Sequence, residues 1–171
     1  MPSPKRISER TGRPARGPDD AADIAATRLA GWRGAYGPLL PPDAFDRVDL
    51  TRWTQNTRSR LETNPNSMRV AEVGGEVLGF CAYGAGRDED LAHACEVYAI
   101  YAQPRSWSTG VGRTLMSSAL DDLSRPVALW VLRDNPRARR FYEIAGFRPD
   151  GAEKTADVLG FDLPDVRYLL D

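Results

Sequence analysis

One stretch of the chain decides the fold: EVYAIYAQPRSWSTGVGRTLMSSAL, residues 96–120. Residues 96–102 are rich in aromatic and β-branched side chains and read as a strand, which ends at Gln103-Pro104. A loop of small residues follows, and residues 113–120 have the composition of a helix. This order builds an anion site, because the first amides of a helix have no partner inside it and the helix dipole places partial positive charge there.

Two glycines make this loop suitable for a phosphate. Gly110 and Gly112 lack the Cβ atoms that would keep a phosphate away from the amides, although a plain turn explains a lone Gly-x-Gly equally well. A Rossmann fingerprint is excluded because Leu115 stands at its third glycine position. A P-loop is excluded because the only lysines are Lys5 and Lys154. The expected ligand carries a phosphate or pyrophosphate.

A second stretch, LWVLRDNPRARRFYEIAGF, spans residues 129–147 and reads as a strand followed by a capped helix. Asn135 suits the N-cap, Pro136 the first helical position and Gly146 the C-terminal end. These features predict an amphipathic helix whatever the function. Its apolar stripe consists of Ala138, Phe141, Tyr142 and Ala145.

Together the two stretches resemble the GNAT superfamily of acetyl-CoA-dependent N-acetyltransferases. The family's loop pattern, Gln/Arg-x-x-Gly-x-Gly/Ala, is met by residues 107–112, although Trp107 stands at the Gln/Arg position. The resemblance covers most of the chain and is strongest over residues 95–148. The second signature, Asn-x-x-Ala-x-x-Phe-Tyr-x-x-x-Gly-Phe, is met at Asn135, Ala138, Phe141, Tyr142, Gly146 and Phe147.

The resemblance implies one α/β (α+β) domain over residues 11–171, with a mixed, mostly antiparallel sheet flanked by helices. In this fold strands 96–102 and 127–132 are parallel neighbours joined by a right-handed crossover. They are expected to part near Ala102 and to admit the pantetheine arm of acetyl-CoA between them.

The same resemblance assigns residues to the cofactor. Backbone groups near Ile100 and Ala102, together with Asn135, are expected to bond the pantetheine. Because Trp107 and Thr109 replace residues that are often basic or glycine in the family, Arg105 or Arg113 is expected to supply the missing charge. The pyrophosphate is expected at Trp107, Ser108, Thr109, Gly110, Val111, Gly112 and Arg113.

The implied reaction is direct attack of a primary amine on the thioester in a ternary complex. Tyr142 is the candidate general acid for the departing thiolate, with a purely packing role as the alternative. Glu96 is either the base that deprotonates the amine or a structural carboxylate, and the sequence favours neither. His93, the only histidine, is expected to be incidental.

The acceptor is less well defined, and its identity is left open. In the family the N-terminal helices wall the acceptor groove, so Trp32, Tyr36 and Trp53 are either substrate-facing or core residues. Tyr168 and the loop 155–164 of the closing hairpin, together with Glu96, are further candidates for substrate binding.

The remaining elements follow from local signals. A short strand is expected at 13–16, and a helix that begins at 18–21 and is broken by Gly34, Gly37 and Pro38. Residues 96, 98 and 100 are expected on one face of the central strand, and 97, 99 and 101 on the other. Further predictions are a helix at 43–62, strands at 68–73 and 76–83, and a hairpin of 148–154 and 166–170 joined by residues 159–164.

Composition excludes several classes of partner. The 171 residues suffice for one domain, and a net charge of −1 gives no field for nucleic acid. No apolar run approaches the roughly 18 residues of a membrane span. Cys81 and Cys95 are too few for a disulfide framework or a zinc site, so no metal is expected. We expect a soluble, cytoplasmic protein with a mobile tail at residues 1–10, and a homodimer is left open.

Two rival functions remain. One is a non-catalytic acyl-CoA-binding or regulatory domain that keeps the pocket without turnover. The other is an acetyltransferase whose acceptor is a protein or a charged tRNA, and the weak net charge disfavours the tRNA.

Overall fold

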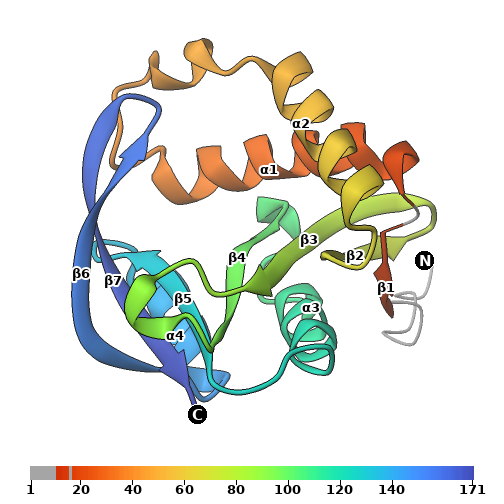
Figure 1. The fold of residues 1–171 in the computed structure, drawn as a ribbon. Helices are drawn as coiled ribbons and strands as arrows, with labels where there is room; N and C mark the ends of the chain where they lie inside the picture. The colour runs from red at the N-terminus through yellow and green to blue at the C-terminus, as the bar shows by residue number, and fades with distance from the viewer. Residues whose placement is uncertain (1–10, 16) are drawn as a thin grey trace, which may run out of the picture.

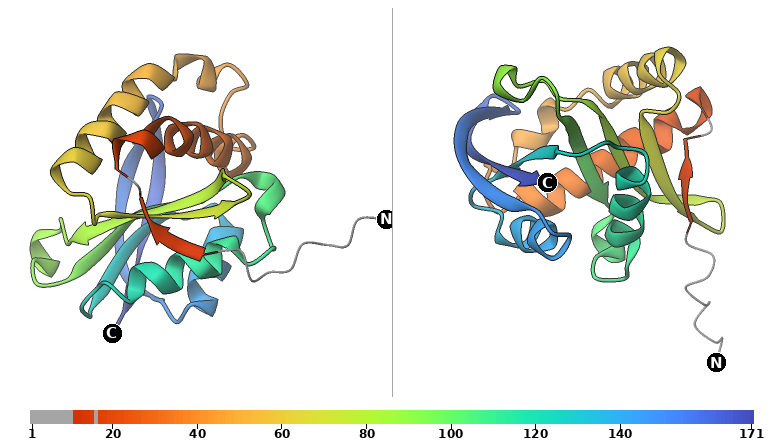
Figure 2. Two further views of the ribbon diagram at one scale, coloured as in Figure 1. Left: turned by 90° about the vertical axis from the view of Figure 1, so that its right-hand side faces the viewer. Right: turned by 60° about the horizontal axis from the view of Figure 1, so that its bottom comes forward.

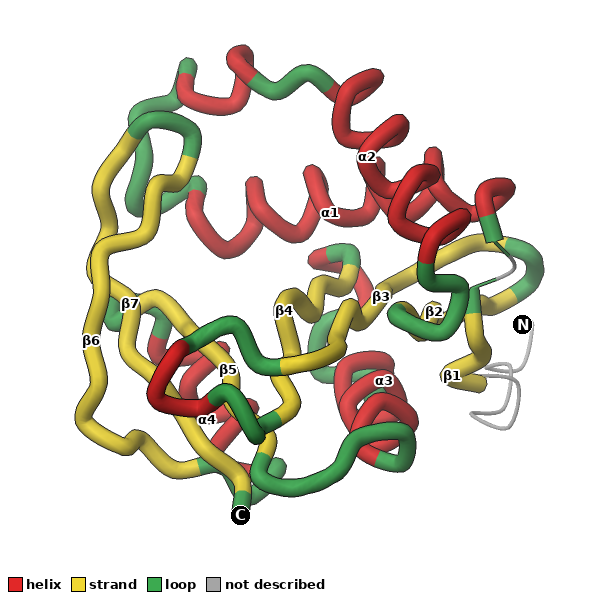
Figure 3. Tube along the Cα trace, in the orientation of Figure 1, coloured by secondary structure: helices red, strands yellow, loops and turns green. Residues whose placement is uncertain are grey.

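The computed structural model describes residues 11–15 and 17–171, which form one mixed sheet with helices on both faces (Figure 1, Figure 3). The seven strands follow the order β1-β2-β3-β4-β5-β7-β6, and all neighbours are antiparallel except β4 and β5. The expected α/β (α+β) class with a mixed, mostly antiparallel sheet is thus confirmed. The tail predicted at residues 1–10 lies outside the described residues.

The strands are β1 (Thr11–Pro14), β2 (Met68–Val73), β3 (Glu76–Ala85), β4 (Cys95–Ala102), β5 (Val127–Leu132), β6 (Arg148–Val158) and β7 (Phe161–Leu170). The helices are α1 (Ala21–Tyr36), α2 (Leu50–Thr63), α3 (Val111–Leu120) and α4 (Pro136–Ile144). Short 3-10 turns lie at Pro18–Asp20, Ala44–Arg47, Glu89–Leu91 and Pro104–Ser106.

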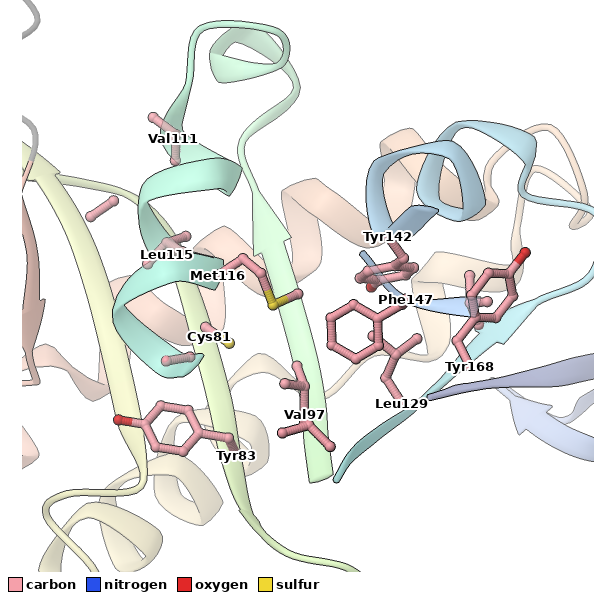
Figure 4. Close-up of a cluster of buried hydrophobic side chains, with 14 residues drawn as sticks. Cys81, Tyr83, Val97, Val111, Leu115, Met116, Leu129, Tyr142, Phe147 and Tyr168 are labelled. Carbon is pink, nitrogen blue, oxygen red and sulfur yellow. The ribbon is translucent and has the colours of Figure 1, made fainter. Parts of the chain in front are cut away.

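The helices divide the structure into two sides (Figure 2). Helices α1 and α2 cover one face of the sheet, where Ile24 and Leu61 pack against Phe80. Helices α3 and α4 cover the other face. The larger core lies there and includes Leu115, Met116, Leu129, Tyr142 and Phe147 (Figure 4).

Strand β4 contains an irregularity that the sequence does not reveal. Ala82 of β3 pairs with Ala99, but the next residue, Tyr83, pairs with Val97, so Tyr98 is an extra residue on β4. This β-bulge reverses the alternation of side chains. Val97 and Ile100 pack in the α3 core, whereas Ala99 and Tyr101 pack on the α1 side. The predicted faces (96, 98, 100 against 97, 99, 101) are therefore wrong beyond residue 97.

The parallel strands β4 and β5 run together over only a short distance. Their pairs are Cys95 with Val127, Glu96 with Ala128 and Val97 with Leu129. The strands thus part after Val97 and not near Ala102 as predicted. The bulge supplies a local reason, because an extra residue bends the strand and increases its twist. Beyond this point none of the described strands pairs with β4 on its β5 side.

The helical predictions before residue 68 need two corrections. Helix α1 continues through Gly34 to Tyr36, since a single glycine costs a helix only about 1 kcal/mol. A Cβ at Gly34 would lie 2.6 Å from the Trp107 ring, so close packing requires the glycine. The predicted helix at 43–62 is two pieces, because the Asp49 side chain accepts from the Arg52 amide and starts α2 afresh.

The closing hairpin is longer than predicted. Residues 159–164 were expected to connect its arms, but Leu159 and Gly160 alone form the turn, with φ of 58° and 85°. Two successive residues of positive φ make the tight turn that joins twisted strands. Strand β7 therefore includes residues 161–165, which the sequence places in a loop.

Candidate active site

A cavity of about 1430 Å³ lies where β4 and β5 part. One end is lined by the loop 106–113 and the start of α4, and the other by α1, β6 and β7. Residues 98–102 of β4 and 130–132 of β5, which lie beyond the last β4–β5 pair, line the cavity as well. The cavity thus connects the predicted cofactor loop with the predicted acceptor side.

The cofactor end presents unpaired amides. Gly110 is the N-cap of α3 with φ of 97°, and Ser108 also has a positive φ, of 60°. No backbone carbonyl of the described residues accepts from the amides of 110–113. Such amides at a helix start can bind an anion, so the geometry is compatible with the phosphate site that the sequence predicts. Gly110 permits the left-handed cap, whereas Gly112 leaves room for the Phe141 ring, which a Cβ would approach to 3.2 Å.

Trp107 has a packing role at this end. Its Nε1 donates to the Ala102 carbonyl at 3.0 Å, and the Arg137 guanidinium stacks 3.4 Å from its ring centroid. Arg137 and Arg113 both line the cavity and bring positive charge to it. Arg105 does not line it, and instead bonds Glu76 and Gln103. The sequence offered no local signal for Arg137.

Two of the residues predicted to bond the pantetheine already make hydrogen bonds within the protein. Asn135 Oδ1 accepts from the Ala138 amide at 3.0 Å and caps α4, which leaves the side-chain NH₂ group to donate elsewhere. The Ala102 carbonyl accepts from Trp107, so one lone pair remains for a further donor. Ile100, Ala102 and Asn135 all line the cavity.

Tyr142 reaches the cavity from the α4 side. It is 8% exposed, and its ring packs edge-on against Phe141 and Phe147. Figure 4 shows Tyr142 beside Phe147 in the core. Its hydroxyl makes no hydrogen bond with any described residue. Burial raises the pKa of this hydroxyl, so it carries its proton throughout the physiological range.

Glu96 is held away from the cavity. Its carboxylate accepts from Arg87 Nε at 3.1 Å, from Arg87 Nη2 at 2.5 Å and from the Arg87 backbone amide at 3.1 Å. The residue is 2% exposed, and Arg87, not Glu96, lines the cavity. Of the two roles left open by the sequence, these contacts favour the structural carboxylate.

Aromatic side chains wall the acceptor end. Trp32 and Tyr36 line the cavity, whereas Trp53 packs against Trp32 with ring centroids 5.1 Å apart. The Tyr36 and Tyr101 hydroxyls are hydrogen-bonded at 2.7 Å. The Arg28 guanidinium lies between the two tryptophans, 5.0 Å and 4.5 Å from their centroids.

The structure does not bring Tyr168 to the acceptor end. Tyr168 is fully buried on the α3–α4 side, where its hydroxyl accepts from Arg139 and donates to Glu143. Its strand instead contributes Asp165, which the sequence analysis missed. The stretch before Asp165 contains Pro164 and resembles a loop, so no local signal predicted that β7 carries this residue to the cavity.

Comparisons with known proteins agree with this architecture. The model of the acetyltransferase (GNAT) family matches residues 30–147, more than half of the chain. The chain belongs to this family. As a GNAT member it is an acyltransferase, and the family's relatives are named N-acetyltransferases.

Individual relatives extend over nearly the whole chain. "Probable N-acetyltransferase Rv2775" of Mycobacterium tuberculosis is 31% identical over 159 residues, which covers 90% of this GNAT chain and 89% of the relative. The structure resembles PaiA N-acetyltransferase of Thermoplasma acidophilum in complex with coenzyme A, with a TM-score of 0.69 at 16% identity and coverage of 92% and 97%. It also resembles the putative acetyltransferase yncA of Salmonella typhimurium with acetyl-CoA, with a TM-score of 0.68 at 22% identity and coverage of 95% and 93%.

Two further observations concern the described part of this GNAT chain. None of its helices combines the length and the apolar character needed to cross a bilayer. Within the same residues, no group of three or more His, Cys, Asp or Glu side chains is arranged to hold a metal ion.

Proposed function

We propose that this protein transfers an acetyl group from acetyl-CoA to a primary amine by direct attack in a ternary complex. The observation that carries the proposal is the early parting of β4 and β5, with one continuous cavity in the gap. A thioester and an amine that approach from opposite ends of this cavity would meet between the strands. No covalent enzyme intermediate is then needed.

The cofactor end supports acetyl-CoA as the donor. The amides of residues 110–113 suit a pyrophosphate, and Arg113 and Arg137 add positive charge beside them. Asn135 and the free β4 edge supply donors and acceptors for the pantetheine amides. Two structures of similar fold contain coenzyme A or acetyl-CoA, which supports acetyl-CoA as the donor.

Tyr142 is the proposed general acid. Tyr142 lines the cavity, its hydroxyl has no hydrogen-bond partner among the described residues, and burial keeps it protonated. The same burial disfavours a thiolate beside it, so proton transfer to the departing sulfur relieves an unfavourable charge. Backbone amides on the β5-facing edge of β4, near Ile100, are the proposed donors to the tetrahedral oxyanion.

Glu96 is proposed to orient Arg87 and not to act as the base. Its carboxylate already accepts three hydrogen bonds from Arg87. Glu96→Gln should therefore leave the shape of the pH–rate profile unchanged. Loss of one limb of that profile in the variant would restore Glu96 as the base.

An assay of thiol release tests the function. The purified protein is mixed with acetyl-CoA and a panel of primary amines, and free thiol and acetylated product are quantified together. Amine-dependent release of both products in equal amounts is expected. Saturable acetyl-CoA binding without any turnover would favour the binding-domain alternative. A steep salt dependence of acceptor binding would favour a tRNA acceptor.

A further inference from the structure

Asp165 points toward the acceptor side of the sheet. Val166 and Tyr168 of the same strand contact the α3–α4 core, and Leu163 belongs to the cluster on the α1 side. Because side chains alternate along a strand, Asp165 shares the face of Leu163. Its partner on β5 is Leu132, beyond the last β4–β5 pair. The carboxyl group therefore adjoins the gap from the α1 side, opposite Tyr142.

Asp165 differs from the other buried acids of the described residues. Asp20 bonds Arg13, and Glu96 bonds Arg87. Asp165 is only 9% exposed and lines the cavity, yet within the described residues it makes no hydrogen bond and no ion pair. Burial without a partner raises the pKa of its carboxyl group. A buried carboxylate in a cavity needs a counter-ion, and no side chain of residues 11–15 and 17–171 forms an ion pair with Asp165.

The groups that face Asp165 do not occupy the position of its counter-ion. Its cross-strand neighbour on β6 is Lys154, whose charge lowers the pKa of Asp165. The Lys154 ammonium, however, lies 4.0 Å from the Trp130 ring centroid and forms no ion pair with the acid. The other groups that face Asp165 are the neutral hydroxyls of Tyr36 from α1, Tyr101 from β4 and Tyr142 from α4. Burial is the main cause that raises the pKa values of these hydroxyls, and the charge of Asp165 raises them further.

We propose that Asp165 binds the acceptor as its ammonium ion and then removes the proton that blocks attack. The inference rests on the proposed function and defines its substrate class: primary alkylamines that arrive positively charged. Trp32 and Tyr36 wall the same end of the cavity and suit the apolar body of such an amine. Asp165 would then be a catalytic residue, because it contacts the reacting nitrogen.

The steps balance as follows. Asp165 takes one proton from the ammonium nitrogen, and the freed lone pair forms a C–N bond with the thioester carbonyl carbon. The C–S bond breaks with its electron pair on sulfur, and Tyr142 gives that sulfur its proton. The tyrosinate takes the second proton from nitrogen, and Asp165 releases its proton to water. The products are one amide, one free thiol and one proton.

The test compares two amines of similar shape and different charge. Near pH 7 ethylamine is an ammonium ion, because alkylamines of the lysine type titrate near ~10.4. The fluorines of 2,2,2-trifluoroethylamine withdraw electrons, so this amine is mainly neutral. Each is mixed with acetyl-CoA and the unaltered protein, Asp165→Asn or Asp162→Asn. Asp162 is an exposed acid of the same strand that does not line the cavity, so it controls for the chemical change.

The expected result separates a base from a structural residue. Asp165→Asn should lower kcat/KM for ethylamine by about 100-fold and for trifluoroethylamine by less than about threefold, with unchanged acetyl-CoA affinity. Asp162→Asn should match the unaltered protein with both amines. Equal losses with both amines, or no loss with ethylamine, would overturn the role of Asp165. If the unaltered protein acetylated neither these two amines nor any amine of the panel above, the proposed amine-acceptor function itself would fail.

Discussion

Tyr142 is the residue that we propose as the proton donor to the leaving thiolate. Removing only its hydroxyl, in Tyr142→Phe, keeps the ring contacts with Phe141 and Phe147 and removes the proton donor. Steady-state kinetics should show kcat lower by about ten- to a thousandfold, with nearly unchanged acetyl-CoA affinity. Unchanged turnover would assign Tyr142 to packing alone.

The raised pKa of Asp165 also predicts how the stability of the protein depends on pH. The pKa of Asp165 is higher in the folded protein than in the unfolded chain, so the folded state binds the carboxyl proton more tightly. The free energy of unfolding therefore falls as pH rises from the unfolded pKa to the folded pKa. Asp165→Asn removes this dependence. Its Tm should exceed that of the unaltered protein near neutral pH, and the difference should disappear as pH falls toward 4. A lower Tm at neutral pH would show that Asp165 has a stabilising partner, and Asp162→Asn is the matched control.

At the level of single residues, the sequence predicted which residues line the cofactor side of the cavity better than which residues line its acceptor side. Gly110, Asn135 and Tyr142 stand in fixed local patterns, and all three line the cavity. Asp165 comes from a strand distant in sequence, and only the hairpin register brings it to the gap. Tyr168 was predicted beside the substrate, but it lies three positions after Asp165 on β7. The two side chains therefore face opposite sides of the sheet, and Tyr168 lies in the core.

At the level of elements, the start of α3 is the proposed phosphate site. Gly110→Ala places a Cβ on a left-handed N-cap and should cost about 1–2 kcal/mol of stability. The displaced amides should also raise the Kd for acetyl-CoA roughly tenfold, which calorimetry would measure.

A matched control for that variant lies in another turn. Gly75 has φ of 85° in the β2–β3 hairpin, and it does not line the cavity. Gly75→Ala should lose similar stability and keep its acetyl-CoA affinity. If both variants bound acetyl-CoA equally well, the α3 start would not be the phosphate site.

The boundaries of elements followed the sequence where caps and turns are local. Strand β5 has the predicted limits, and the cap of α4 is the predicted Asn135. Prediction failed where distant packing decides. Gly34 stays helical because Trp107 packs against it, and the Tyr98 bulge depends on the register with β3.

For the whole molecule, acetyl-CoA should bind the folded chain and stabilise it. At an acetyl-CoA concentration of about 100 times Kd, the free energy of unfolding should rise by about 2.7 kcal/mol. For this chain length that corresponds to a Tm rise of about 5–10 °C. Acetyl-pantetheine lacks the pyrophosphate and should give a much smaller rise at the same concentration. Equal rises in thermal denaturation scans would show that the phosphates contribute nothing.

The placement of the donor between β4 and β5 is tested most directly by a crystal structure with bound acetyl-CoA. We expect a pyrophosphate within hydrogen-bonding distance of the amides of 110–113. We further expect a thioester between the separated strands, with Tyr142 on one side and Asp165 on the other. Acetyl-CoA bound elsewhere, or β4 and β5 paired beyond Val97 in the complex, would contradict this placement.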